Sequence, residues 1–133
     1  MREIGMAVVV HDGKILIAQR KKTMRQGGLW EFAGGKVEAG ETPEDCIRRE
    51  FMEELGMPVN VGAFCKEMRY SYPDSGDFLF HVYWATCDNP IPAFLNAHEQ
   101  IAWVTPAELD QYTFCPADVP LIEFLKNSKK SLS

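Results

Sequence analysis

The sequence predicts a mixed α/β sandwich built as a single domain over residues 1–133. Three observations lead to this fold class. Apolar or alternating segments typical of strands lie on both sides of one strongly patterned helix. The chain has 133 residues, 46% of them hydrophobic and 25% charged, which is an ordinary composition for a globular domain. No internal repeat, low-complexity tract or linker divides the chain.

The N-terminal part predicts a hairpin, a basic loop and a short strand. The first segment is apolar and β-branched, which is typical of a buried strand. Asp12 and Gly13 favour a tight hairpin turn. Gly34 and Gly35 are expected to end the third strand. The expected strands cover residues 4–10, 15–20 and 29–33, with the turn at 11–14 and the loop at 21–28.

Residues 42–55 form the clearest predicted helix. Thr42 is a good N-cap, and Pro43 occupies the first helical position, where its missing N–H is tolerated. Gly56 is placed to stop the helix. The apolar stripe recurs at four-residue spacing, at Ile47, Phe51 and Leu55.

The C-terminal half predicts a second hairpin, one more strand and a second helix. Alternating apolar residues indicate the hairpin, and its turn contains Pro73 and Gly76. The expected elements are strands at 59–70 and 78–86 around a turn at 72–76, a strand at 101–104, a helical turn at 106–110, a helix at 116–126 and a frayed tail at 127–133.

Charge and cysteine content exclude several classes of protein. The 14 basic and 19 acidic residues give a net charge of −5, which is a poor match for a nucleic-acid polymer. No apolar run reaches the length of a membrane span, and the N-terminus lacks the pattern of a signal peptide. The four cysteines are widely and unevenly spaced, which indicates reduced thiols rather than a disulfide framework. We therefore expect a cytoplasmic protein that acts on a small molecule and uses no membrane.

Three glutamates share one face of the predicted helix. Glu50, Glu53 and Glu54 stand at positions i, i+3 and i+4, so their carboxylates lie on adjoining turns. Like charges at this spacing are unfavourable unless a cation lies among them. Mg²⁺ prefers oxygen ligands and suits a site that it shares with substrate phosphates. The glutamates alone leave open the alternative of a solvated acidic helix face.

A glycine pair precedes this helix. Gly34 and Gly35 leave the backbone bare, so its carbonyls or amides can approach a ligand closely. Such a loop leading to a helix N-terminus is a recurrent neighbourhood for phosphate. An ordinary turn is the alternative interpretation.

The stretch from Gly35 to Met57 resembles the Nudix box in full. Gly35 is followed after five residues by Glu41, and after seven more by the run Arg49-Glu50-Phe51-Met52-Glu53-Glu54-Leu55-Gly56-Met57. Similarity to the MutT branch, and to its CTP pyrophosphohydrolase and 8-oxo-dGTP diphosphatase members, covers residues 3–126. The family fold is an α/β/α sandwich with a mixed central β-sheet. The further matching segments are residues 18–20, 29–36, 97–99 before Trp103, and 116–120.

The resemblance implies a site for Mg²⁺, with Mn²⁺ as a substitute. Residues matching Glu50, Glu53 and Glu54 bind the metal in the family, and the backbone carbonyl matching Gly34 adds a ligand. We expect Glu50 and Glu54 to be the principal ligands and Glu53 to act as the catalytic base. Arg49 is expected to orient a neighbouring glutamate.

The resemblance also implies residues outside the box. Glu99, expected in the loop before residues 101–104, matches a glutamate that binds metal or acts as base; a solvated loop acid is the alternative. Arg20 matches a nucleotide-contacting arginine. Asp118 lies at an expected helix start, where relatives carry an asparagine that reads the base; a helix N-cap is the alternative. Tyr72 is expected to stack on the base, and the other candidates for this wall, with a core role as alternative, are Tyr70, Phe78 and Phe80.

The implied activity is hydrolysis of a nucleoside triphosphate to a nucleoside monophosphate and pyrophosphate. Water would attack the β-phosphorus, and the enzyme would be a hydrolase acting on phosphoric anhydrides. Cytidine-type and 8-oxo-dGTP substrates both fit the sequence. Two alternatives stay open, namely a Nudix hydrolase of another nucleoside diphosphate derivative such as a nucleotide sugar, and a non-catalytic Nudix-like sensor.

Overall fold

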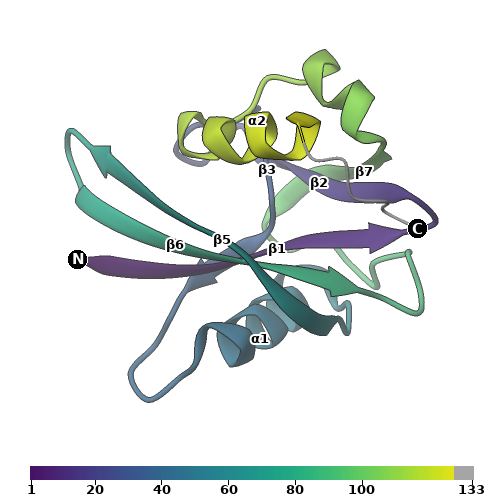
Figure 1. The fold of residues 1–133 in the computed structure, drawn as a ribbon, viewed down its shortest axis with the longest axis horizontal. Helices are drawn as coiled ribbons and strands as arrows, with labels where there is room; N and C mark the ends of the chain where they lie inside the picture. Colours follow the sequence, from purple (N-terminus) through teal and green to yellow (C-terminus); the bar gives the residue numbers. More distant parts are fainter. Residues whose placement is uncertain (128–133) are drawn as a thin grey trace.

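The computed structural model describes residues 1–127, which fold into three layers (Figure 1). Helix α1 (Pro43–Leu55) covers one face of the sheet. Helix α2 (Val119–Asn127) covers the other face, together with the 3-10 helices η1 (Pro106–Gln111) and η2 (Pro116–Asp118). The predicted α/β/α sandwich is confirmed. Of the tail expected at 127–133, only Asn127 is among the described residues, and it ends α2.

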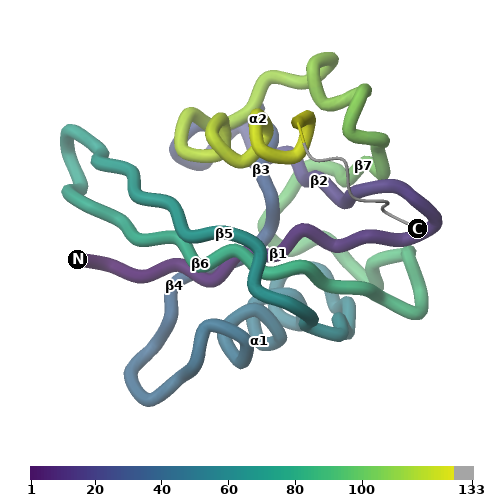
Figure 2. Tube along the Cα trace, viewed as in Figure 1, coloured from purple at the N-terminus to yellow at the C-terminus, as the bar shows by residue number. Residues whose placement is uncertain are grey.

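The middle layer is one mixed sheet. Its strands run in the order β3-β2-β1-β6-β5, with β4 paired to β1 and β7 paired to β2. Strands β1 and β6 are parallel, and the other pairs are antiparallel. Figure 2 traces the chain through this arrangement. The strands are β1 (Arg2–His11), β2 (Lys14–Arg20), β3 (Trp30–Glu31), β4 (Gly34–Lys36), β5 (Asn60–Tyr72), β6 (Gly76–Thr86) and β7 (His98–Val104).

Strands β1 and β2 meet only at their hairpin and then separate. Their pairing is confined to Val10 with Ile15 and His11 with Lys14, next to the left-handed turn residues Asp12 and Gly13. The predicted hairpin is confirmed. Beyond it, β4 takes the place of β2 beside the first half of β1.

Helix α1 begins and ends as the sequence predicts. The Thr42 hydroxyl accepts a hydrogen bond from the Asp45 N–H at 3.1 Å, and Pro43 opens the first turn. Gly56 adopts φ 57° and ψ 37°, the left-handed geometry that favours glycine, and its N–H bonds to the Met52 carbonyl at 3.1 Å. Both ends of the helix are therefore fixed by local hydrogen bonds.

The core is divided between the two faces of the sheet. On the α1 side, Ile47, Phe51 and Leu55 pack against Ala7 and Val9 of β1. On the other face of the sheet, α2 packs against the side chains of the same strands that alternate with those of the first group. The α2-side group includes Val8, Ile17, Val82, Leu121, Ile122 and Leu125. Because β1 alternates its side chains between the two groups, it forms the centre of the packing.

Gly34 and Gly35 differ from the prediction. They do not end a strand as a turn but form β4, paired with β1 through Met6 with Gly34 and Gly5 with Gly35. A Cβ at Gly34 would overlap the backbone of Gly5. The glycine is thus needed for close strand approach, which a three-residue segment with two glycines does not reveal.

Two C-terminal boundaries also differ. Strand β7 begins at His98 rather than at residue 101, because Arg20 of β2 pairs with His98 after a bulge. Glu99 therefore lies in a strand and not in a loop. The helix expected at 116–126 is divided, because Pro120 has no N–H to bond to the Pro116 carbonyl; the Val119 N–H bonds to it instead and closes the 3-10 turn η2. No helix among residues 1–127 has the length and apolar character needed to cross a membrane.

Candidate active site

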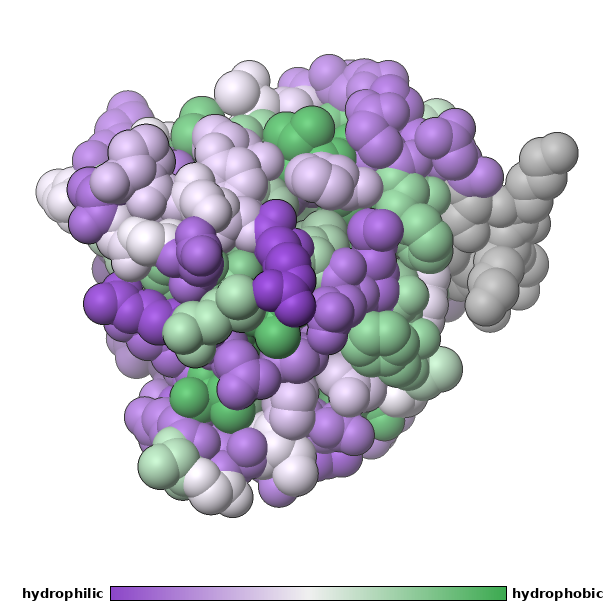
Figure 3. Space-filling view, turned by 60° about the vertical axis from the view of Figure 1, so that its left-hand side comes forward, coloured by the Kyte–Doolittle hydropathy of each residue, from purple (hydrophilic) through white to green (hydrophobic). Residues whose placement is uncertain are grey.

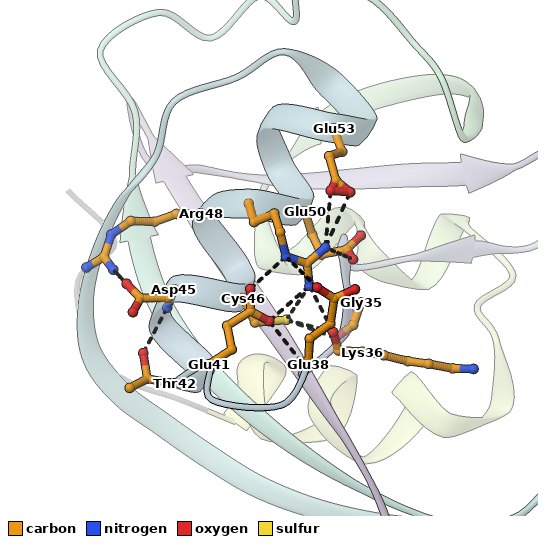
Figure 4. Close-up of polar contacts among 11 residues, drawn as sticks. Gly35, Lys36, Glu38, Glu41, Thr42, Asp45, Cys46, Arg48, Glu50 and Glu53 are labelled. Carbon is orange, nitrogen blue, oxygen red and sulfur yellow. Dashed lines mark hydrogen bonds and ion pairs between the residues drawn. The ribbon is translucent and has the colours of Figure 1, made fainter.

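Arg49 of α1 joins three glutamates. Its guanidinium donates to Glu41 at 2.7 and 3.0 Å, to Glu50 at 2.9 Å and to Glu53 at 3.2 Å. It also donates to the backbone carbonyl of Lys36 at 3.0 Å, at the end of β4. Figure 4 shows the carboxylates of Glu41, Glu50 and Glu53 turned toward this centre. Arg49 therefore contacts both Glu50 and Glu53, and its orienting role in catalysis stays a prediction.

Glu41 belongs to the loop that leads into α1. Its carboxylate accepts a hydrogen bond from the Glu38 N–H at 3.0 Å, and the hydrogen bonds from Arg49 lower its pKa to about 2. The same contact raises the pKa of Arg49. Glu41 thus supports the loop, and Arg49 stays charged beside it.

The backbone of β4 lies directly against Glu50. A Cβ at Gly35 would overlap the Glu50 carboxyl group, so only glycine leaves room for it there. The Cys46 thiol donates to the Gly35 carbonyl at 3.3 Å, and burial raises its pKa to about 11. The glycine strand therefore forms a close wall beside a carboxylate of the helix.

Glu50 and Glu54 form a largely buried acidic pair on α1. Their side chains are 18% and 15% exposed. Burial, the neighbouring Glu50 carboxyl and the charge of Glu31 together raise the pKa of Glu54 far above its usual range. A buried carboxylate pair of this kind favours either a shared proton or a bound cation. The donor set therefore fits a divalent metal ion.

The ligands do not yet converge on one point. Within residues 1–127, no three carboxylate, imidazole or thiol side chains are gathered as the ligands of one ion. Arg49 holds Glu50 and Glu53 instead, and Glu53 is 56% exposed. Glu50 already contacts Glu54, so metal binding would need Glu53 to turn from the arginine toward this pair.

Glu31 and His98 form a second buried group beside Glu54. The Glu31 carboxylate accepts from Arg20 Nη1 at 3.1 Å and from His98 Nε2 at 2.9 Å. His98 Nε2 also lies 3.8 Å from a Glu54 oxygen, and its Nδ1 is buried with no hydrogen-bond partner among the described residues. Because a carboxylate only accepts, the Nε2 atom carries the ring proton. Sequence reasoning missed both residues, although each stands in a segment that resembles the MutT branch.

A cavity of about 440 Å³ connects these groups. Of the residues predicted for the site, it brings together Gly34, Glu54, Arg20, Asp118 and Tyr72. The lining also includes Arg25, Glu31, Gly35, Ser75, Phe78 and Phe80. Tyr70 does not line the cavity, and Glu99 is exposed on β7 outside it, although the nearby Ala97 is part of the lining.

Asp118 lies in the wall of the cavity and is 2% exposed. Its Oδ2 accepts from the Phe32 N–H at 3.1 Å, between β3 and β4. Burial, together with the charge of Glu31, raises its pKa well above the usual range. This hydrogen bond joins the carboxyl group to another segment of the chain, and the contacts described for residues 1–127 include none from it to the first turn of α2.

The cavity also has an aromatic wall on the β5–β6 hairpin. The ring of Tyr72 meets Tyr70 at 4.8 Å and Phe78 at 5.1 Å, both edge-on. Burial raises the Tyr72 pKa to about 12, so its hydroxyl stays protonated at neutral pH. Hydrophilic and hydrophobic side chains are interspersed over the face that Figure 3 presents.

Comparison with known proteins decides the family. The family model described as NUDIX domain matches residues 1–125. The chain belongs to the NUDIX family. This NUDIX chain is 39% identical over 123 residues to a protein of Escherichia coli (strain K12) named CTP pyrophosphohydrolase, covering 92% of the chain and 90% of that protein. It is 33% identical over 116 residues to an 8-oxo-dGTP diphosphatase of Haemophilus influenzae, covering 86% and 83%.

Solved structures agree with the NUDIX assignment. The solution structure of the E. coli ORF135 protein matches with a TM-score of 0.74 and 37% identity, covering 97% of this chain and 93% of that one. A MutT protein from Methanosarcina mazei Go1 matches with a TM-score of 0.84, covering 97% and 96%. At 21% identity, this second likeness shows the shared fold alone.

Proposed function

We propose that this NUDIX chain is a Mg²⁺-dependent hydrolase that converts a nucleoside triphosphate to a nucleoside monophosphate and pyrophosphate. The observation that carries the proposal is the buried pair of Glu50 and Glu54 beside the glycine backbone of β4. Glu54 lines a cavity that also holds aromatic and hydrogen-bonding side chains, as a nucleotide site requires. The relatives named CTP pyrophosphohydrolase and 8-oxo-dGTP diphosphatase support this substrate class.

The box glutamates would hold the metal. Glu50 and Glu54 are proposed as principal ligands, with Glu53, the Gly34 carbonyl and Glu99 as further candidates. When bound, Mg²⁺ would neutralise phosphate charge and acidify the attacking water; Mn²⁺ is proposed as a substitute. Glu99 is the weakest candidate, since its side chain is exposed outside the cavity.

Glu53 is proposed as the base that takes a proton from the water attacking the β-phosphorus. Its carboxylate is exposed, so it can reach a water, and Arg49 restrains it from one side at 3.2 Å. As a positioning residue, Arg49 would fix the direction of the Glu50 and Glu53 carboxylates. Catalysis would then consist of positioning and charge stabilisation.

Two further side chains are proposed to bind the nucleotide itself, one at its phosphates and one at its base. Arg20 lines the cavity; the Arg25 carbonyl and Glu31 engage its Nε and Nη1, and its Nη2 is proposed to donate to phosphate oxygens. Asp118 is proposed to read the base. A protonated carboxyl group donates one hydrogen bond and accepts others, so it suits a base edge with neighbouring donor and acceptor atoms, as in cytosine or 8-oxoguanine.

One panel tests this function. Canonical and oxidised nucleoside triphosphates, with a nucleotide sugar included, would be assayed for pyrophosphate or monophosphate release with Mg²⁺. We expect pyrophosphate release from CTP, dCTP or 8-oxo-dGTP, and a loss of at least ~10²-fold in Glu53→Gln, because the amide cannot accept the proton. Glu123→Gln on the exposed face of α2 is the matched control. Activity confined to the nucleotide sugar, or full turnover in Glu53→Gln, would contradict the proposal.

A further inference from the structure

Arg25 crosses from the 21–28 loop to the turn of the β5–β6 hairpin. Its Nη1 donates to the Ser75 hydroxyl at 2.5 Å, and its Nη2 forms an ion pair with Asp74. Its guanidinium carbon lies 4.9 Å from the centre of the Tyr72 ring. Three side chains of the hairpin thus hold one arginine of a distant loop. In Figure 1 this hairpin extends to the side of the sheet where the N-terminus lies.

This contact changes the expected role of Tyr72. Tyr70 and Phe78 meet the ring edge-on, and Arg25 lies over its face. A nucleobase that enters the cavity therefore does not find that ring face free. Arg25 lines the same cavity, and its side chain is 48% exposed, so the guanidinium keeps a surface that a ligand can reach.

The fixation of Arg25 decides which ligand group it suits. Each terminal nitrogen already donates to a side chain of the hairpin, and the Asp74 carboxylate offsets the positive charge. A phosphate would approach the same edge of the guanidinium beside the Asp74 carboxylate, whose negative charge opposes it. A base on the planar face avoids that repulsion, because a delocalised guanidinium stacks on flat π systems while its edges stay hydrogen-bonded.

We propose that Arg25 is the stacking platform for the nucleobase, carried on Tyr72 and locked by Asp74 and Ser75. The inference rests on the proposed function only in taking a nucleotide as the ligand. In this arrangement Tyr72 supports the base through Arg25 rather than by direct contact. Arg25 then contributes to base binding, while Arg20 serves the phosphates.

The test separates the base from the phosphates. Calorimetry would measure the binding of CMP and 8-oxo-dGMP, which carry a base, and of inorganic tripolyphosphate with Mg²⁺, which does not. We expect Arg25→Ala to weaken the better nucleotide about five- to thirtyfold and to leave tripolyphosphate within twofold of wild type. Arg25→Lys keeps the charge but loses the plane, so it should resemble Arg25→Ala.

Asp74→Asn tests the lock. Asp74 does not line the cavity, and its loss should weaken nucleotide binding about two- to fivefold by freeing the arginine. The control is Asp110→Asn, which breaks an exposed ion pair with Lys126 at 2.8 Å, also outside the cavity lining, and should change nothing.

Several results would overturn the stacking role. These are equal losses for nucleotide and tripolyphosphate, full retention in Arg25→Lys, wild-type binding in Arg25→Ala, or no binding of either nucleotide by the wild type. Binding of a monophosphate needs no turnover. The absence of pyrophosphate release from the substrate panel would therefore count against the proposed function and not against the role of Arg25.

Discussion

Asp118 shows how a single buried carboxyl group can serve both the fold and the ligand. One oxygen accepts the Phe32 N–H, which would otherwise be a buried donor without a partner. Burial raises the pKa of the group, so the carboxyl stays protonated at a pH where an exposed aspartate is ionised. A neutral carboxyl in the wall of the cavity offers a donor as well as an acceptor.

Asp118→Asn should change how the stability of the protein depends on pH. The folded-state pKa of Asp118 lies above the unfolded value, so the folded state holds the proton more tightly. The stability this contributes is complete below about pH 4 and is lost as the pH rises through the folded pKa. The amide keeps the hydrogen bond to Phe32 and does not titrate. We therefore expect the Tm of Asp118→Asn, relative to wild type, to rise between pH 4 and pH 8.

The same variants report on the base. Asp118→Ala should raise KM more than it lowers kcat and should cost about 1–3 kcal/mol of stability, because the Phe32 N–H loses its partner. Asp118→Asn should instead alter the ratio of kcat/KM between CTP and 8-oxo-dGTP, since it changes the donors and acceptors offered to the base. A constant Tm difference across pH together with an unchanged substrate ratio would show that Asp118 is purely structural.

For single residues, the sequence predicts what depends on helical spacing and misses what depends on long-range contact. The i, i+3 and i+4 spacing of Glu50, Glu53 and Glu54 is enough to place the three carboxylates on one helix face. Glu31 and His98 lie far apart in sequence and meet only because β2 lies between β3 and β7 in the sheet. No local pattern in the sequence carries that contact.

Among the elements, β4 and α1 act together. The glycines of β4 let the strand approach β1 on one side and Glu50 of α1 on the other. Helix α1 is predictable in full because its cap, proline, stripe and terminal glycine are all local signals. Strand β4 is not, because two of its three residues have no side chain and its pairing partner is β1.

The two glycines should respond differently to alanine. In Gly35→Ala the new methyl group would displace the carboxyl end of Glu50, a flexible side chain, so we expect a folded protein with Mg²⁺ activation weakened about 10–100-fold. In Gly34→Ala it would overlap the backbone of Gly5, which cannot move aside, so we expect loss of several kcal/mol or failure to fold. Thermal unfolding and Mg²⁺ titration of activity measure the two effects. Equal losses of stability and equal losses of Mg²⁺ activation in the two variants would contradict these separate roles of Gly34 and Gly35.

Over the whole molecule, the acidic pair on α1 links metal binding to stability. Glu50 and Glu54 lie on a helix whose apolar stripe fills one of the two cores. Charge repulsion between the two carboxylates therefore lowers the stability of the whole domain. Anything that binds the folded state and relieves that repulsion raises its stability by mass action.

We therefore expect Mg²⁺ to raise the Tm, by about 2.7 kcal/mol of stability when its concentration is 100 times the dissociation constant. Glu54→Gln removes one proposed ligand of the metal ion, so the Tm of this variant should respond less to Mg²⁺ than that of wild type. NaCl at the same ionic strength is the control for general screening. A Tm that Mg²⁺ does not move, with activity retained in excess chelator, would refute the metal site.

The position of β1 sets the order in which the chain can assemble during synthesis. Its parallel partner is β6, so Arg2 pairs with Phe78 and Val10 with Thr86. When only the first hairpin and α1 have left the ribosome, the central strand β1 therefore still lacks one of its neighbours. That edge stays open until β6 emerges, and because β5 and β6 form a local hairpin, they can arrive as a preformed unit. The domain should consequently become resistant to protease in one late step, after β6 leaves the exit tunnel, and not progressively from its N-terminus.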